Sequence, residues 1–331
     1  NMHHIIGDGW SMEVLSKDVL AYYEAYKSGT KPDLEELRIQ YKDYSAWQLS
    51  QLEGESYQKH REYWLDNLSG ELPLLNLPST ESRPEVKTYI GSTLTTFIDK
   101  PLVTLLNKYS KESNGTLFMG LVASLNTLLH RYTSENDIVI GTPIAGREHS
   151  DLEGQIGFYV NALALRNQID LQDDFDSIFA KSKETVLNAY THQMYPFDRL
   201  VEELKQSRST SRNAVFDILI VLQNAGENVE QFSISTDDIN AIIESRKGTS
   251  IYDIKFDFEE QGEYLKFSVE YNTDVYEERM IKSLIMHYKE LLPNLLKQPK
   301  QEVSTIEYLS PLEKRELIEN FNDTKVDYPS D

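Results

Sequence analysis

The sequence has no cysteine among its 331 residues. This absence excludes a disulfide framework, a thiolate nucleophile and a zinc–thiolate site. The zinc-enzyme spacing His-Glu-x-x-His and the nucleophile motif Gly-x-Ser-x-Gly are also absent. Covalent catalysis through a cysteine or through such a serine is therefore not expected.

Positive charge is scarce. Lysine and arginine number 33 against 54 aspartate and glutamate residues, which gives a formal net charge of -21. This charge argues against nucleic acid and against an anionic membrane surface as partners. No apolar run approaches the length of a membrane span and no signal peptide precedes Met2. We therefore expect a cytoplasmic protein. Its composition, with 40% hydrophobic and 26% charged residues, is that of an ordinary globular chain.

One stretch carries side chains suited to proton transfer, namely Met2-His3-His4-Ile5-Ile6-Gly7-Asp8-Gly9-Trp10-Ser11. If Met2–His4 ends a strand, His3 and His4 point to opposite faces, and only one of them enters a given cleft. Gly7 and Gly9 would supply the φ freedom of a tight turn around Asp8. Ser11 is a good N-cap for a helix that begins near Met12. The stretch predicts a strand, a strained loop and a helix, with one imidazole presented at the loop.

The stretch alone leaves other interpretations open. Adjacent histidines are usually surface residues or structural residues. A metal site is not expected, because neighbouring side chains on opposite faces cannot chelate one ion.

The remainder of the chain alternates helices and strands. We expect a helix from Ser11 to Tyr26 ended by Gly29, a helical region over Asp43–Leu68 closed by Gly70, and a crossover at residues 71–86. Later strands are expected at Tyr89–Ile98, Asp137–Pro143, Phe158–Leu165, Val215–Leu222, Asp253–Glu259 and Tyr264–Tyr271, the last two as a hairpin. Helices are expected at Thr116–Tyr132, Asp174–Ala189, Tyr276–Leu296 and Leu312–Asn320, and a loop at Gly141–Glu153. This order predicts an α/β sandwich in each of two lobes.

Several motifs resemble a known family, and they occur in its order. His-His-x-x-x-Asp-Gly at His3–Gly9 is the signature of the acyltransferase superfamily that contains chloramphenicol acetyltransferase and the condensation domains of nonribosomal peptide synthetases. Further segments resemble later motifs of the condensation domains: Tyr41-Lys42-Asp43-Tyr44-Ser45-Ala46-Trp47, Ile156-Gly157-Phe158-Tyr159-Val160-Asn161 with Arg166, His192-Gln193-Met194-Tyr195-Pro196-Phe197-Asp198, and Arg208-Ser209-Thr210-Ser211-Arg212-Asn213. Met194 departs from the family, where an acidic residue is common.

The resemblance implies an acyl transfer between two thioesters, each tethered to the phosphopantetheine arm of a carrier domain. The acceptor amine attacks the donor carbonyl, and an amide forms inside a tunnel between the lobes. His4 matches the residue at the centre of the tunnel, either as general base or as a positioning and charge-stabilising group. Gly9 either brings a backbone N–H toward the oxyanion or serves only the turn.

The other matched positions are expected to be structural or to line the tunnel. The resemblance implies structural roles for His3 and for Asp8, whose arginine partner the sequence does not identify. Trp10, Ser11, Asn161, Arg212 and Asn213 are expected along the substrate tunnel. For Asn161 a bond to a neighbouring strand is the alternative, and for Arg212 and Asn213 a surface loop.

The resemblance also implies an architecture. We expect a chloramphenicol acetyltransferase-like, two-lobed α/β sandwich from which most of the N-terminal lobe is missing, so that the fragment alone is inactive. Residues 1–86 would be the remainder of that lobe, 87–301 the C-terminal lobe, and 302–331 the linker and start of an adenylation domain. The expected partners are an upstream donor carrier domain, a downstream acceptor carrier domain and the adenylation domain in cis. No cofactor is expected on the domain itself, because 4′-phosphopantetheine belongs to the carriers.

Two other functions stay open at this point. One is a related acyltransferase that uses free coenzyme A thioesters. The other is a non-catalytic domain that docks carriers or tailoring enzymes.

Overall fold

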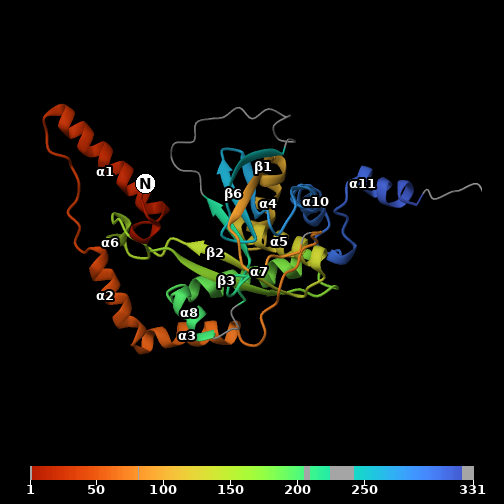
Figure 1. Ribbon diagram of the computed structural model, residues 1–331, viewed down its shortest axis with the longest axis horizontal. Coiled ribbons are helices and arrows are strands. Elements are labelled where there is room, and N and C mark those ends of the chain that lie inside the picture. The colour runs from red at the N-terminus through yellow and green to blue at the C-terminus, as the bar shows by residue number, and fades with distance from the viewer. Residues whose placement is uncertain (1, 81, 205–208, 224–241, 323–331) are drawn as a thin grey trace, which may run out of the picture. The chain divides into compact units, whose positions relative to one another are not determined.

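The structure is a computed structural model, which describes residues 2–80, 82–204, 209–223 and 242–322 (Figure 1). The chain divides into two compact units. The first unit comprises Asn1–Leu72, Gly141–Ala164 and Asn188–Ser207, and the second comprises Pro73–Ile140, Leu165–Leu187 and Arg208–Asp331. The domain limits expected after residues 86 and 301 stay a prediction. In the described ranges no helix combines the length and the apolar character that a membrane span requires.

Helices dominate the first unit. They are η1 (His4–Ile6), α1 (Gly9–Ser28), α2 (Tyr41–Leu52), α3 (Glu55–Asn67), α6 (Ser150–Glu153) and α8 (Phe197–Leu204). The Asp8 carboxylate caps α1 by accepting the Ser11 N–H, and Gly29 ends the helix at a left-handed φ of 68°. The end of α1 was therefore predicted correctly, but its N-cap is Asp8 and not Ser11.

The backbone before α1 differs from the prediction. Met2–His4 does not end a strand, because the N–H groups of Ile6 and Gly7 bond locally to His3 O at 3.2 Å and His4 O at 3.4 Å and so form η1. The predicted role of the glycines is also wrong. Gly7 is extended at a φ of -174°, and Gly9 lies inside α1. A Cβ at Gly7 would lie 2.6 Å from Cε at the flexible end of Met2, which can move away, and 3.3 Å from Ser11 Cβ.

The predicted helical region over Asp43–Leu68 is two helices. α2 begins after Gln40, whose N–H donates to Asp43 at 2.9 Å, and it ends at Leu52. Gly54 is the extended N-cap of α3, with φ -94° and ψ 159°. An extended residue cannot continue a helix, so the chain breaks between α2 and α3.

A seven-stranded sheet has the strand order β3-β2-β4-β6-β7-β1-β5. The strands are β1 (Ile90–Ile98), β2 (Asp137–Ile144), β3 (Asn161–Gln168), β4 (Ile218–Gln223), β5 (Ile243–Thr249), β6 (Ile254–Gln261) and β7 (Tyr264–Asn272). β4 pairs with β6 in parallel, whereas β6, β7, β1 and β5 pair antiparallel in turn. The predicted hairpin of β6 and β7 is confirmed and turns at Gly262, whose φ is 62°.

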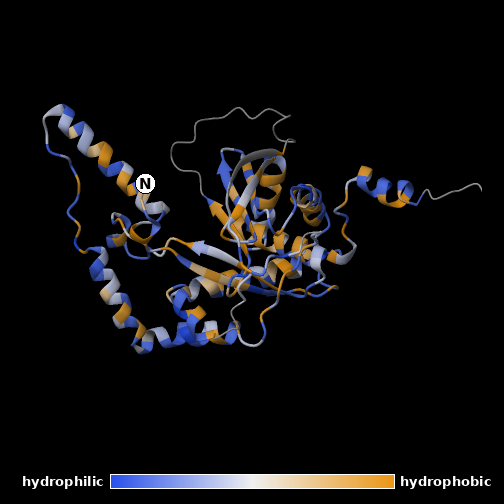
Figure 2. Cartoon of the chain, viewed as in Figure 1, coloured by the Kyte–Doolittle hydropathy of each residue, from blue (hydrophilic) through white to orange (hydrophobic). Residues whose placement is uncertain are grey.

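The helices of the second unit supply its core. They are α4 (Lys100–Glu112), α5 (Leu117–Thr133), α7 (Phe175–Thr191, up to Leu187) and α10 (Glu278–Lys297), followed by η2 (Val303–Thr305), α11 (Pro311–Arg315) and η3 (Glu316–Asn320). α4 and α10 pack against α5 and against the sheet (Figures 1 and 2). Phe258 and Phe267 stack at 4.7 Å beneath Tyr288 of α10. Burial of these aromatic and aliphatic side chains drives the packing.

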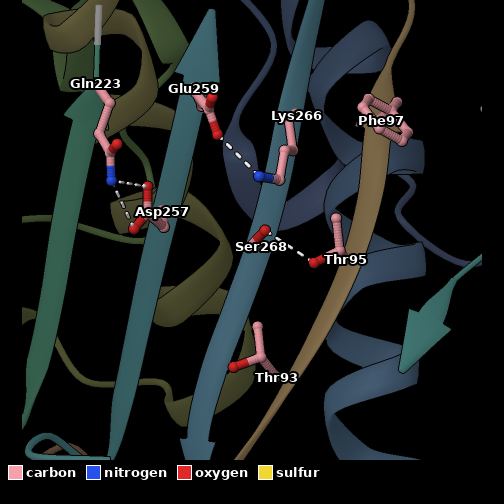
Figure 3. Close-up of a pocket in the computed structure, with 8 residues that line it drawn as sticks. All are labelled: Thr93, Thr95, Phe97, Gln223, Asp257, Glu259, Lys266 and Ser268. Carbon is pink, nitrogen blue, oxygen red and sulfur yellow. Dashed lines mark hydrogen bonds and ion pairs between the residues drawn. The ribbon is translucent and has the colours of Figure 1, made fainter. Parts of the chain in front are cut away.

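Apart from Phe97, the side chains that these strands place around a cavity on the other sheet face are polar. Thr95 and Ser268 hydroxyls lie 2.9 Å apart, and Lys266 pairs with Glu259 at 2.8 Å (Figure 3). With Asp257 and Gln223 they line this cavity of about 560 Å³. The period-2 alternation of apolar and polar residues thus assigns one sheet face to the core and leaves the other hydrophilic.

The remaining strand and tail predictions need small corrections. β3 begins at Asn161 and not at Phe158, β4 begins at Ile218 and not at Val215, and β5 was not predicted. The predicted loop Gly141–Glu153 contains the end of β2 and the whole of α6. The predicted helix Leu312–Asn320 is α11 followed by the π-helical η3. Of residues 302–331, expected as the linker and start of an adenylation domain, 323–331 lie outside the described residues, and the expectation stays a prediction.

Candidate active site

The centre of the first unit is a buried ion pair between Asp8 and Arg147. Arg147 Nη2 donates to Asp8 Oδ1 at 3.1 Å, and both side chains are at most 1% exposed. Asp8 also accepts the Ser11 N–H at 2.8 Å and the Tyr159 N–H at 3.1 Å. These bonds tie the His motif to residues far along the chain.

The electrostatics of Asp8 follow from these donors. Burial by itself raises the pKa of its carboxyl, but the side-chain and backbone hydrogen bonds of Ser11, the backbone N–H of Tyr159 and the charge of Arg147 act in the opposite direction. Together they hold the pKa below its ordinary value of 3.8. Asp8 is therefore an ionised acceptor at neutral pH.

Arg147 is the partner that sequence reasoning did not identify. Its guanidinium also donates to Gln155 O at 2.8 Å and to Leu152 O, and it lies 4.1 Å from the Tyr159 ring. It belongs to the segment predicted only as a charged loop. The sequence did offer a signal next to it, namely the glycine at 146. Glycine readily adopts a left-handed φ, which is 64° here.

We predict that Gly146→Ala lowers the free energy of unfolding by about 1–3 kcal/mol. A Cβ at this left-handed position would lie 2.0 Å from Tyr159 O. Urea unfolding followed by circular dichroism measures the change. Gly9→Ala is the matched control, since no atom lies within 4 Å of a Cβ there. Equal stability of the two variants would contradict the steric explanation.

His3 and His4 carry their protons on different nitrogens. His4 Nδ1 lies 2.7 Å from Gly7 O. A carbonyl oxygen can only accept, so Nδ1 carries the proton and Nε2 of the neutral ring keeps its lone pair. His3 Nδ1 instead accepts the Ile5 N–H at 3.1 Å, which places its proton on Nε2. Of these two residues, His4 is therefore the one whose Nε2 can take up a proton in the neutral form.

Phe158 fixes the ring of His4 from one side. The two ring centroids lie 5.2 Å apart at 80°, an edge-to-face contact. His4 itself is exposed. Its Nε2 has no hydrogen-bond partner in the part of the chain that the structure describes.

The next three motif residues have different environments. Gly9 is exposed at the first turn of α1, and its N–H has no acceptor among residues 2–80, 82–204, 209–223 and 242–322. Trp10 is 41% exposed and donates through Nε1 to Glu153 O at 2.8 Å. Ser11 is fully buried, its hydroxyl within 3.1 Å of Asp8, Arg147 and the backbone of Gly157. The predicted tunnel roles of Trp10 and Ser11 stay predictions.

Asn161 holds the turn between α7 and α8. Its Nδ2 donates to Gln193 O at 2.9 Å and to Tyr195 O at 2.8 Å, and its Oδ1 accepts the Phe197 N–H at 2.9 Å. All three bonds go to the His192–Asp198 motif. The bond to a neighbouring strand, considered as an alternative, is replaced by bonds to this turn, and a tunnel role for Asn161 stays a prediction.

Arg212 and Asn213 belong to the second unit. Arg212 Nη1 pairs with Asp217 at 2.7 Å, and the Asn213 N–H donates to the other oxygen of that carboxylate at 2.9 Å. Asn213 Oδ1 accepts from Lys87. Both residues are half-buried and hold the loop before β4, so they are not on a free surface loop. Their expected place along the tunnel stays a prediction.

A second pair of histidines, His60 and His192, lies close together in the first unit. Their Nδ1 atoms are 3.1 Å apart, so one ring donates and the other accepts. His192 also stacks on Tyr63 at 4.1 Å. Burial lowers the pKa of His60, and burial together with the charge of His60 lowers the pKa of His192.

We predict that this histidine pair makes stability fall in mild acid. The pKa values of both histidines in the folded state lie below the ordinary 6.5. The contribution of the neutral pair to the free energy of unfolding is therefore complete above that pH, and it is lost as pH falls through the folded pKa values. The expected loss is about 1 kcal/mol, the net worth of one hydrogen bond. Urea unfolding at pH 7.5 and 5.5 measures it. In His60→Gln the difference between the two pH values should shrink, and an unchanged difference would contradict the assignment.

A cavity of about 230 Å³ lies beside Phe158 in the first unit. Its wall includes aromatic side chains from α2 and from the Phe158–Tyr159 segment, and it includes Asn161 and Met194. Among the described residues no group of three or more histidine, aspartate or glutamate side chains is placed to hold a metal ion.

The sequence is similar to known proteins. A family model described as "Condensation domain" matches residues 1–318. Gramicidin S synthase 2 of Brevibacillus brevis is 36% identical over 332 residues, which are 99% of this chain and 7% of that protein. Surfactin synthase subunit 1 of Bacillus subtilis (strain 168) is 35% identical over 334 residues, 100% of this chain and 9% of that protein. The chain therefore spans less than a tenth of either relative.

Solved structures share the fold. The X-domain from teicoplanin biosynthesis matches with a TM-score of 0.80 and 24% identity, over 93% of this chain and 71% of that chain. A four-domain nonribosomal peptide synthetase bound to AMP and glycine matches with a TM-score of 0.81 and 21% identity, over 95% of this chain and 24% of that one. At these identities the likeness establishes the mixed α/β fold and nothing more.

Proposed function

This chain belongs to the condensation-domain family, and from that premise we propose that it forms the amide bond between two substrates held as thioesters on carrier domains. Condensation domains of nonribosomal peptide synthetases are acyltransferases that make peptide bonds between carrier-bound substrates. For this chain the pairing with an upstream donor carrier, a downstream acceptor carrier and an adenylation domain in cis is part of the proposal, as is a location in the cytoplasm. The 4′-phosphopantetheine arms belong to the carriers.

The observation that carries the proposal is the His4 Nδ1–Gly7 O hydrogen bond of 2.7 Å. It supports a role for Nε2 as the atom that accepts a proton from the attacking acceptor amine. The amine nitrogen forms the new C–N bond to the donor carbonyl, and the C–S bond of the donor thioester breaks. The proton then passes from His4 to the departing thiolate, so that an amide and a thiol are the products.

The other motif residues support this chemistry from fixed positions. The exposed N–H of Gly9 is our candidate donor to the oxyanion of the tetrahedral intermediate. Asp8 is assigned a structural role, because its carboxylate is occupied by Ser11, Tyr159 and Arg147. His3 is assigned a structural role as well, since its Nδ1 caps η1. A thioester is already activated, so holding both reactants together supplies much of the rate.

The test uses the parent synthetase module with both carriers loaded and follows the acceptor carrier by intact mass spectrometry. Appearance of the dipeptidyl or acyl-aminoacyl carrier supports the proposal. Turnover of coenzyme A thioesters without any carrier would replace it with a coenzyme A-dependent acyltransferase, although a chain of net charge -21 attracts such polyphosphate substrates poorly. Carrier binding without product in either assay would replace it with a docking domain.

A further inference from the structure

The cavity beside Phe158 has a lining suited to one kind of side chain. Its volume of about 230 Å³ lies below the range of roughly 300–1,000 Å³ typical of sites for drug-sized ligands. The wall combines the rings of Tyr41, Tyr44 and Phe158 with the thioether of Met194. Such a wall accommodates a flexible aliphatic chain.

The charges of the lining are all of one sign. Glu148 and Asp198 contribute carboxylates, and the residues that line the cavity include no lysine or arginine. Within the described residues neither carboxylate forms an ion pair. The nearby Arg147 does not neutralise them, because its charge is already paired with Asp8 in a buried contact.

The aromatic rings strengthen the preference for a cation. The ring centroids of Tyr41 and Tyr44 lie 6.1 Å apart, and those of Tyr44 and Tyr159 lie 4.7 Å apart. Aromatic rings attract cations, and this cluster already holds one, because the Arg147 guanidinium lies 4.1 Å from the centroid of the Tyr159 ring. Burial, followed by the charges of Tyr41 and Glu148, raises the pKa of Tyr44 to about 12, so its hydroxyl stays protonated.

The cavity is also close to the reacting position. Phe158 forms part of its wall and at the same time contacts the ring of His4 at 5.2 Å. The Tyr41 hydroxyl holds this segment by donating to Phe158 O at 3.0 Å. Phe158 therefore separates the cavity from His4 by a single ring.

We infer that this cavity binds the alkylammonium side chain of an amino-acid substrate, of the lysine or ornithine type. The methylene chain packs on Tyr41, Tyr44 and Met194, and the ammonium lies between Glu148 and Asp198. The identity of the ligand as a substrate rests on the proposed function.

Binding to the purified 331-residue chain, measured by NMR titration, tests the inference. The probes are Nα-acetyl-L-lysine amide, Nα-acetyl-L-norleucine amide, which lacks the side-chain ammonium, and L-norleucine amide, whose only ammonium is at the α position. We expect the lysine probe to bind about threefold to tenfold more tightly than either norleucine probe. Equal binding of the first two probes, or no saturable binding of any, would overturn the inference. Tighter binding of L-norleucine amide would reassign the cavity to the acceptor α-amine and overturn it as well.

Variants locate the effect. Glu148→Gln/Asp198→Asn should remove the preference for the lysine probe, whereas Met194→Glu should increase it. Glu13→Gln/Asp18→Asn, on α1, removes the same charge outside the cavity and should keep the preference. If this control also loses its preference for the lysine probe, the preference arises from net charge and the proposed binding site is refuted. Thermal melts confirm that all variants are folded. The assay contains no carriers, so failure of condensation activity and failure of this binding are read separately.

Discussion

Replacing Asp8 with alanine is expected to lower the free energy of unfolding by about 3–5 kcal/mol. The reason is the state of Arg147, whose side chain is 1% exposed. It would stay buried after losing the one carboxylate that pairs with it among the described residues. The variant also leaves the N–H groups of Ser11 and Tyr159 without their acceptor. A loss of this size is a substantial fraction of the roughly 5–15 kcal/mol by which an ordinary domain is stable.

Urea unfolding of the purified chain measures the effect, and a double-mutant cycle separates its causes. Asp8→Ala/Arg147→Met removes both charges, and we expect it to recover part of the stability because no buried charge is left unpaired. If Asp8→Ala unfolds at the same urea concentration as the wild type, the ion pair does not hold the His motif in place.

The same ion pair has a pH signature. The folded pKa of Asp8 lies below its ordinary 3.8, so its contribution is complete above that pH and is lost as pH falls through the folded value. The stability difference between wild type and Asp8→Asn should therefore shrink only below about pH 4. This window is separate from that of the His60–His192 pair, which lies below pH 6.5.

Replacing His4 with alanine is expected to lower the rate of amide formation by about 10²–10⁴-fold, the usual contribution of a general base. His3→Ala is the matched control, because it removes the neighbouring imidazole whose Nδ1 only caps η1. We expect less than about a tenfold effect from it, since the loss of a cap is worth roughly 1 kcal/mol.

The measurement is the initial rate of product on the acceptor carrier, determined by intact mass spectrometry at equal concentrations of folded protein. Loss of product in His4→Ala, with both carriers still loaded, places His4 in the chemical step. An undiminished rate would mean that His4 has a structural role and that catalysis comes from holding the two thioester substrates close together. Equal losses in both variants would point to damage of the loop and not to a proton transfer at Nε2.

Local patterns accounted for much of the architecture. The β6–β7 hairpin was predicted from two alternating runs around Gly262, and the end of α1 from Gly29. Both features depend on residues adjacent in sequence, where side-chain period and glycine conformation are decisive. The start of β3 was misplaced because the backbone of Phe158 and Tyr159 bonds to Tyr41 and Asp8, not to a neighbouring strand.

The sequence by itself determined the α/β class, the family and the identity of the His motif, because each depends on local patterns and on their order along the chain. Only the tertiary structure decided which arginine pairs with Asp8, since Arg147 lies 139 residues further along the chain. It likewise decided which imidazole presents a free Nε2 and which side chains enclose the cavity beside Phe158. Charge pairing, tautomer and cavity shape all depend on atoms brought together from distant segments, and no local pattern specifies such contacts.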